Sequence, residues 1–570
     1  MSLANMSLAR LSRHSLLIAL LALWPVSASA APTDPKLEAR FRKLARVASK
    51  KTVCVIGVVG SGTGAVIEGD GTTVTNAHVA AASPYAILMF ADGRKVLAKR
   101  HGIDYRRDLA ILRPVELPVA PLPHFELADK RPPAGTVIVG VGYPGGPRST
   151  ADPAFCVGVV TGDKGPANVN GMLDYGDAIR SDLPLFPGNS GGPCVDLQGR
   201  LVGINGAVDL QGSASFSVPI ETVHDRRERL HAGLSLLPGN QQIDARRNPI
   251  VKLFRDQFDR LVLDMMKQRL NPKQGGDNPL LELLKGSQGS GDKRGRAPKP
   301  PAAGPVHVES DELALRARRS RRQALLRPLV AGALEAARSA VIPLLNEDGR
   351  ILGFATAITR RHAVAPLDRV GDRRTFRSAE LTLKLVAVDR SQGVALLVAS
   401  KRLSPLEPGL DTAPGTIVAT PAGPRGIAGV LSVRQRPVSA ARAGAIANGG
   451  GLPAPIRDLL LRAKALAKRL GSKELAQLAD QILNSTKARE QYMRGNRPRG
   501  YRGVLSHDAP LAPSEIGLPL VDRRGRLVGV NLSNAHFGTS YALGIKALAR
   551  AFPQLGLRTR PAPRKGAKLY

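Results

Sequence analysis

Three residues that lie far apart in the sequence have the types needed to hydrolyse an amide bond by nucleophilic catalysis. Ser190 lies in the stretch PGNSGGP, His78 in TNAHV and Asp108 in RRDLAIL. A serine hydroxyl is a weak nucleophile until an imidazole takes its proton, and a carboxylate on the far ring nitrogen fixes the tautomer of that imidazole. We therefore predict that Ser190 attacks, His78 transfers the proton and Asp108 orients His78.

The glycines around Ser190 could supply the remaining requirement, donors for the developing oxyanion. Glycine lets the backbone turn sharply and approach a substrate carbonyl, so the expected donors are the amides of Gly188 and Ser190. Taken singly, each motif has a simpler interpretation as a turn, a surface ion pair or a packed histidine. Their joint occurrence favours catalysis, and the sequence predicts neither a cofactor nor a metal ion.

Short apolar runs surround these residues and predict the strands that position them. Between residues 52 and 236, runs of four to seven apolar residues alternate with Gly, Asp and Pro. This rhythm favours an antiparallel barrel or sandwich over a sheet with crossover helices. His78 follows one predicted strand and Asp108 precedes another, so the ends of strands present both side chains.

The same motifs, in this order, resemble a trypsin-like serine protease of the secreted bacterial Deg/HtrA type. The resemblance covers residues 52–222 and rests on GTGAVIEGDGTTVTNAHV, RRDLAIL, FPGNSGGP, GRLVGIN and FSVPI. It implies two six-stranded barrels, a triad of His78, Asp108 and Ser190 in the cleft between them, and a polypeptide substrate. No PDZ pattern follows residue 236, so the peptide-binding domains usual in that family are not expected.

The residues before Ser190 bear on which side chain a substrate would present. Pro184 stands where trypsins that cleave after basic residues keep an acidic residue. Its neighbours Leu185 and Phe186 predict a preference for a small apolar side chain.

A second copy of the pattern follows. Residues 182–205 and 508–531 agree at 14 of 24 positions, and GTVIV at 135–139 matches GTIVA at 415–419. Unrelated stretches of that length would agree at about one or two positions, so an internal duplication is predicted. The fold class expected is mainly β, with tandem trypsin-like double β-barrels.

The second copy has lost the chemistry. Ile516 takes the place of Ser190, Gly393 that of Asp108 and, in a weaker alignment, Asp368 that of His78. We therefore interpret residues 340–555 as a degenerate, pseudoprotease copy. It also contains a surplus stretch, about 452–495, with two apolar helical patterns, which predicts an inserted helical hairpin.

The remaining segments complete a predicted domain organisation. Residues 1–30 combine Arg10, Arg13, an apolar run and small residues ending at Ala30, which is typical of a signal peptide cleaved there. The protease domain is expected over 31–236, and a helical segment with a basic Pro/Gly-rich linker over 237–339. A basic tail occupies 556–570. No apolar run after residue 30 is long enough to span a membrane, so we expect an extracytoplasmic protein, periplasmic or secreted.

The net charge and the cysteine content limit which partners, metal sites and disulfides are expected. Nearly all of the net charge of +36 comes from residues after 230. An anionic polymer or a membrane surface is therefore an open partner for residues 237–570, and an ordinary solvated surface is the other interpretation. Three cysteines at unrelated spacings predict no metal site. If one disulfide forms, the pattern favours Cys156 with Cys194.

Two functions follow. The first is an extracytoplasmic serine endopeptidase whose second copy regulates it or recruits substrate. The alternative is a non-catalytic scaffold that uses both copies and its basic surface to bind an anionic or protein partner. The three motifs around His78, Asp108 and Ser190 favour the first.

Overall fold

The computed structural model describes residues 35–236 and 322–557, together with a few positions between 259 and 270. Within these ranges the gaps are 58–59, 82, 145, 147–151, 163–166, 170–172, 209–213, 347, 379–380, 411, 536–538 and almost all of 439–500.

The first copy contains a sheet that closes through the pairing of β5 with β6, and a closed barrel. The sheet has the order β15-β5-β4-β1-β2-β3-β6 and consists of β1 (Thr52–Ile56), β2 (Ser61–Val66), β3 (Thr73–Thr75), β4 (Tyr85–Met89), β5 (Lys95–Asp104), β6 (Leu109–Pro114) and β15 (Ser235–Leu236). The barrel has the order β11-β14-β13-β12-β7-β8 and consists of β7 (Val137–Gly142), β8 (Ala154–Gly162), β11 (Ile179–Ser181), β12 (Pro193–Val195), β13 (Leu201–Val208) and β14 (Ser215–Pro219). A separate hairpin joins β9 (Ala167–Val169) to β10 (Leu173–Tyr175).

The second copy repeats this plan with two closed barrels. The first consists of β16 (Val341–Leu345), β17 (Ile351–Ala357), β18 (His362–Pro366), β19 (Thr375–Ser378), β20 (Leu381–Asp389) and β21 (Val394–Ala399). The second consists of β22 (Ile417–Thr420), β23 (Ile427–Val438), β24 (Tyr501–His507), β25 (Pro519–Asp522), β26 (Leu527–Ala535) and β27 (Thr539–Gly544).

Short helices connect and flank the barrels. They are α2 (Pro35–Lys50), α3 (Ala77–Ala80), α4 (Ile220–His231), α8 (Ala331–Arg338), α9 (Leu367–Val370) and α13 (Ile545–Ala551), with 3₁₀ turns η2 (Arg327–Val330), η3 (Pro513–Glu515) and η4 (Pro553–Leu555).

The strand sequences match the burial that each barrel imposes. The β7 strand, VIVGVG, is buried along nearly its whole length and is apolar throughout. The β20 strand, LTLKLVAVD, alternates, so that Lys384 and Val386 face solvent while their neighbours turn inward. A period of two is what a half-buried strand requires, because successive side chains point to opposite faces.

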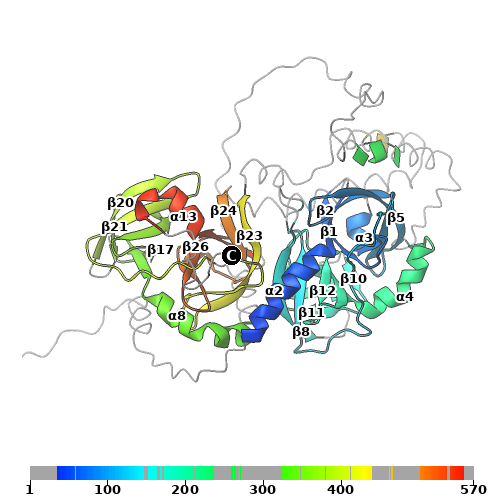
Figure 1. Ribbon diagram of the computed structural model, residues 1–570, viewed down its shortest axis with the longest axis horizontal. Coiled ribbons are helices and arrows are strands. Elements are labelled where there is room, and N and C mark those ends of the chain that lie inside the picture. Colours follow the sequence, from blue (N-terminus) through cyan, green and yellow to red (C-terminus); the bar gives the residue numbers. More distant parts are fainter. Residues whose placement is uncertain are drawn as a thin grey trace, which may run out of the picture.

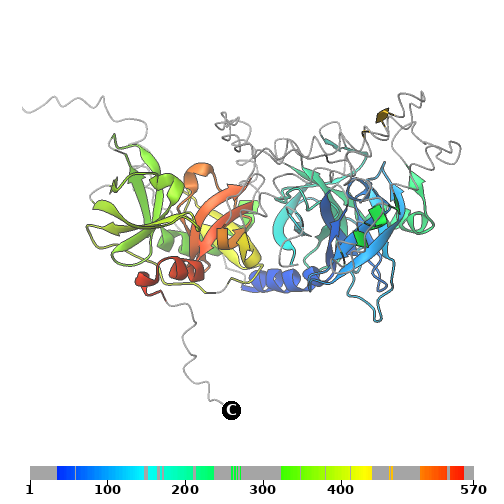
Figure 2. The ribbon, with the colours of Figure 1, turned by 90° about the horizontal axis from the view of Figure 1, so that it is seen from above.

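The two copies form two lobes that share one apolar core (Figure 1). Phe41 and Leu44 of α2 and Phe155 of β8 belong to the same buried cluster as Leu334 of α8 and Ile417 of β22. Helix α2 lies along both lobes in the two views (Figure 1, Figure 2). Because burial of apolar surface contributes roughly 25 cal/mol per Å², a core shared in this way ties the copies together energetically.

The predicted fold class is confirmed: the protein is mainly β, with tandem double barrels. The predicted signal peptide, the basic Pro/Gly-rich part of the linker, almost all of the helical hairpin at about 452–495 and the basic tail beyond residue 557 lie outside the described residues. Their boundaries, and those of the two protease-like domains, stay predictions. None of the helices within the described ranges is both long enough and apolar enough to cross a bilayer.

The disulfide pairing is wrong, since Cys156 and Cys194 are free and buried. Cys194 pairs with Gly140 across β12 and β7, and Gly140 pairs with Cys156 across β7 and β8. The two cysteines therefore sit two strands apart, about 9–10 Å, whereas a disulfide needs Cα atoms within about 7 Å. Burial raises the pKa of both thiols, to about 12 for Cys194.

Candidate active site

His78 and Asp108 are brought together at the ends of their elements. His78 is the second residue of α3, and Asp108 directly precedes β6. The His78 Nδ1 atom lies 2.9 Å from Oδ2 and 3.0 Å from Oδ1 of Asp108. The backbone N–H of His78 also donates to Oδ1, at 3.0 Å. The carboxylate therefore holds the Nδ1 side of the imidazole, and Asp108 itself is 3% exposed.

Asp108 adopts an unusual backbone conformation to do this. Its φ is +52°, and among the described residues it is the one non-glycine with a positive φ. That conformation costs about 1–2 kcal/mol for a residue with a Cβ atom. Asn76 offsets part of the cost, because its Nδ2 donates to the Asp108 carbonyl oxygen at 2.9 Å.

Ser190 lies close to the chain segment that leads into His78, but its hydroxyl makes no hydrogen bond to the His78 imidazole. Its hydroxyl donates to the carbonyl of Gly206 at 2.9 Å, and none of the hydrogen bonds of the described residues joins it to the imidazole. Its own carbonyl accepts from the Thr63 N–H at 2.8 Å. The next residue, Gly191, has φ +83°, and a Cβ there would sit 3.0 Å from the backbone nitrogen of Asn76. The loop that carries Ser190 thus packs within van der Waals contact of the chain that leads into His78.

The backbone around Ser190 leaves two amides available. Among the hydrogen bonds of the described residues, the N–H groups of Gly188 and Ser190 donate to no acceptor. The Gly188 carbonyl is fixed by the Thr63 hydroxyl, which donates to it at 2.6 Å. Gly188 has φ +104°, a conformation that glycine adopts without strain. Free amides on a fixed loop are the donors that an oxyanion would need.

Tyr175 also contacts this cluster, and the sequence analysis did not predict it. Its hydroxyl donates to Oδ2 of Asp108 at 2.7 Å, and the ring is 3% exposed. Burial raises the pKa of Tyr175 well above 10, and the charge of Asp108 and the hydrogen bond to it act in the same direction. The stretch LDYGD around it carries no catalytic pattern, so nothing in the local sequence indicates this contact.

The residues expected to shape a substrate pocket divide into two kinds. Leu185 is buried in the barrel core with Cys156 and Leu183, and it therefore offers no side chain to a substrate. Phe186 is half-buried, and Pro184 is buried. The predicted apolar preference stays a prediction and now rests on Phe186 alone.

At the positions aligned with this site, the second copy has a similar backbone and different side chains. Asp368 is the second residue of α9, as His78 is of α3, but it is exposed. Gly393 has φ +66°, close to the φ of Asp108. Ile516 is buried, and the N–H of the next residue, Gly517, donates to the Asn531 carbonyl at 2.8 Å.

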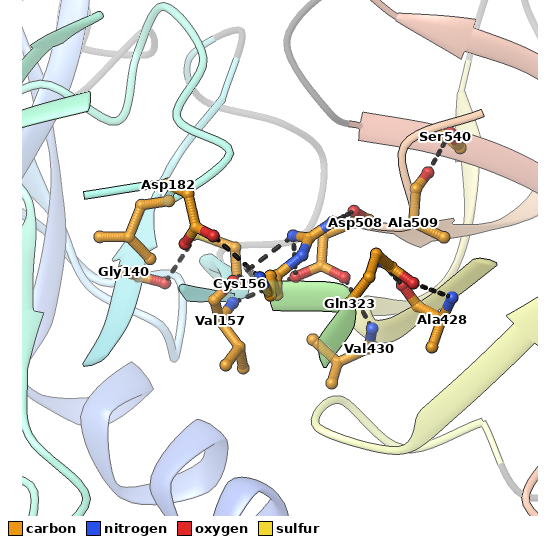
Figure 3. A network of polar contacts seen from close by, with 12 residues as sticks. Gly140, Cys156, Val157, Asp182, Gln323, Ala428, Val430, Asp508, Ala509 and Ser540 are labelled. Atoms are coloured by element: carbon orange, nitrogen blue, oxygen red, sulfur yellow. Dashed lines mark hydrogen bonds and ion pairs between the residues drawn. The ribbon is translucent and has the colours of Figure 1, made fainter. Parts of the chain in front are cut away.

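A buried polar network joins the two copies where β8 approaches β23. Figure 3 shows Asp182 and Val157 on one side, and Asp508, Gln323 and Ala428 on the other. The neighbouring Arg322 is 1% exposed and its guanidinium lies 3.2 Å from the Asp508 carboxylate. The same guanidinium donates to the carbonyls of Val157 and Asp508, and the backbone N–H of Arg322 donates to Asp182 at 3.0 Å.

We call the contact between β8 and β23, together with Arg322 and Gln323, the seam. The duplication places equivalent residues on its two sides. Asp182 accepts from the Val159 N–H at 2.6 Å, and its equivalent Asp508 accepts from the Val430 N–H at 2.7 Å. The other oxygen of Asp508 crosses the seam to the N–H of Val157, at 3.1 Å.

Gln323 completes the network on the side of the second copy. Its amide donates to the Ala428 carbonyl at 2.7 Å and accepts from the Ala428 N–H at 2.8 Å, as a neighbouring strand would. Buried backbone groups are therefore satisfied on both sides of the seam.

Comparison with known proteins agrees with this architecture. Residues 62–204 match the family described as "Trypsin-like peptidase domain". The chain is 33% identical over 181 residues to Serine protease HTRA1B of Danio rerio, covering 30% of this chain and 36% of that protein. It is 34% identical over 179 residues to a "Probable periplasmic serine endoprotease DegP-like" of Pseudomonas fluorescens, covering 30% and 35%.

Among solved structures, "HtrA-type protease AlgW with decapeptide" matches at 23% identity with a TM-score of 0.29, covering 34% of this chain and 68% of that one. The family match and the curated relatives confirm the resemblance predicted from the sequence: residues 62–204 match the trypsin-like peptidase family, and the first copy is similar to Deg/HtrA serine proteases. The chain spans about a third of the length of the curated relatives that it matches.

Proposed function

We propose that this protein is an extracytoplasmic serine endopeptidase whose active site consists of His78, Asp108 and Ser190. The observation that carries the proposal is the contact of His78 Nδ1 with both carboxylate oxygens of Asp108, at 2.9 and 3.0 Å. This contact fixes the tautomer with the proton on Nδ1, which leaves Nε2 free to act as a base. Similarity to relatives named as serine endoproteases supports the same activity.

In the mechanism, Ser190 first leaves its resting partner, the Gly206 carbonyl. Giving up one hydrogen bond costs about 1 kcal/mol, which is small beside a reaction barrier. The hydroxyl then attacks the substrate carbonyl while Nε2 of His78 takes its proton. The amides of Gly188 and Ser190 receive the oxyanion, and His78 returns the proton to the leaving amine.

We further propose that the second copy has no hydrolytic role and acts on the first through the seam. Asp182 belongs to the connection between β11 and β12 that also holds Ser190. Its carboxylate bonds Val159 within the first copy and the backbone of Arg322 in the connector. A displacement of the second copy would therefore be transmitted to the chain segment that carries the nucleophile.

The direct test uses a fluorophosphonate probe and casein as substrate. Wild-type protein should be labelled, and Ser190→Ala should abolish labelling and lower the rate of casein cleavage by about 10⁴-fold or more. The matched control is Ile516→Val at the equivalent position of the second copy, which should be labelled like the wild type. Equal labelling of Ser190→Ala and wild type would refute the nucleophile assignment. A wild type that takes up no probe would instead favour the scaffold alternative.

A further inference from the structure

We propose that Tyr175 is a positioning residue that orients Asp108 across the boundary between the two barrels of the first copy. This inference rests on the proposed function, since it concerns how the same site is assembled. Asp108 precedes β6 in the first sheet, whereas Tyr175 ends β10, in the chain segment that leads from β8 to β11 of the second barrel.

The contacts divide the Asp108 carboxylate between its two neighbours. Oδ1 accepts from the backbone N–H of His78, and Oδ2 accepts from the hydroxyl of Tyr175. Each oxygen thus has one such donor besides the His78 imidazole, and rotation of the carboxylate about its Cβ–Cγ bond would break both of these bonds. The imidazole Nδ1 then meets a carboxylate whose plane is fixed. Since hydrogen bonds to a charged group are about twice as strong as neutral ones, the Tyr175 contact is a substantial restraint.

Tyr175 is built to remain a donor. It is buried in the same apolar cluster as Phe155 and Val218, and its backbone pairs with Ala167 of β9. Burial and the adjacent Asp108 charge raise its pKa, so the phenol keeps its proton at physiological pH. An ionised tyrosine would repel the carboxylate instead of binding it.

Gly206 makes room for this arrangement and connects it to the nucleophile. A Cβ atom at Gly206 would lie 2.3 Å from the Tyr175 hydroxyl oxygen, so only glycine fits there. The carbonyl of the same Gly206 accepts the resting hydrogen bond of Ser190. Tyr175 therefore touches both the orienting carboxylate and the backbone that holds the nucleophile at rest.

The test is Tyr175→Phe, which removes the hydroxyl and keeps the ring in the core. We expect a fall of about 10- to 100-fold in kcat and in the rate of fluorophosphonate labelling, with KM for a peptide substrate unchanged. The control is Tyr541→Phe, a buried tyrosine of the second copy, which should leave both rates unchanged. A Tyr175→Phe protein that matches the wild type in kcat would overturn the inference.

A double-mutant cycle with Asp108→Asn separates positioning from general damage. If Tyr175 acts through Asp108, adding Tyr175→Phe to Asp108→Asn should cause no further loss of the labelling rate. An equal further loss in both backgrounds would show an effect independent of the carboxylate and would also overturn the inference. Failure of the proposed function looks different, because the wild type itself would then not be labelled.

Discussion

Arg322 offers the sharpest test of how the two copies are held together. Its guanidinium and the Asp508 carboxylate are 1% and 2% exposed and lie 3.2 Å apart. Replacement by methionine keeps the volume of the side chain and removes its charge. Asp508 would then keep the Val430 and Val157 N–H donors but lose its counter-ion.

The expected loss of stability follows from these contacts. Removing one member of a buried ion pair costs about 3–5 kcal/mol, because the remaining charge is uncompensated. The Val157 and Asp508 carbonyls lose a donor as well. Burial raises the pKa of Asp508, and Arg322 acts in the opposite direction. Without Arg322 the carboxyl can take up a proton, and this limits the loss of stability. We therefore expect Arg322→Met to lower the free energy of unfolding by about 3 kcal/mol at neutral pH.

Urea unfolding followed by circular dichroism measures this loss. Arg338→Met serves as the control, because the partners of this connector arginine, the Glu335 carboxylate and the Gly423 and Pro424 carbonyls, are exposed, and exposed ion pairs contribute at most about 1 kcal/mol. The double variant Arg322→Met, Asp508→Asn should recover much of the stability, since no buried charge is left unpaired. An Arg322→Met protein as stable as the Arg338→Met control would refute the claim that the seam couples the copies.

Two further predictions concern ionisation and charge. Burial lowers the pKa of His507 to about 4, so the folded state takes up its proton later than the unfolded state on acidification. The wild type should therefore lose up to about 3 kcal/mol relative to His507→Gln as the pH falls from about 6.5 to about 4, measured by urea unfolding at each pH; parallel curves would contradict this. The β19–β20 hairpin and the loop before it expose Arg374, Arg377 and Lys384, which suits an anionic polymer. Heparin binding should weaken as salt rises and weaken further in Arg374→Glu, Arg377→Glu; an affinity independent of salt would remove the electrostatic account.

The strands and the motifs that contain His78, Asp108 and Ser190 could be identified because their signals are local. The run LAILRP became β6, CVGVVTG became β8, and the alignment with GRLVGVN gave the second copy. Helix α2 was not predicted, although Leu37, Phe41, Leu44 and Ala48 follow helical spacing on its buried face.

Tyr175 and Arg322 could not have been predicted, for a different reason. Each makes its decisive contact with residues distant in sequence, Tyr175 with Asp108 and Arg322 with Asp508. An arginine among other arginines normally indicates a solvated helix face, since burial of an unpaired charge is costly. Only the folded structure brings the Asp508 carboxylate to Arg322, and this pairing offsets the cost of burying the guanidinium charge.

Because the two copies are fused in one chain, the two sides of the seam need not have identical residues, as the two sides of a symmetric homodimer interface must. Two identical subunits must offer the same side chain at matching points, so a residue useful on one side is imposed on the other. Here Val157 and Ala428 occupy equivalent positions on β8 and β23. The Val157 backbone bonds the Asp508 carboxylate and the Arg322 guanidinium, whereas the Ala428 backbone bonds the Gln323 amide. Each half can therefore change at a position of the seam without the same substitution appearing in the other half.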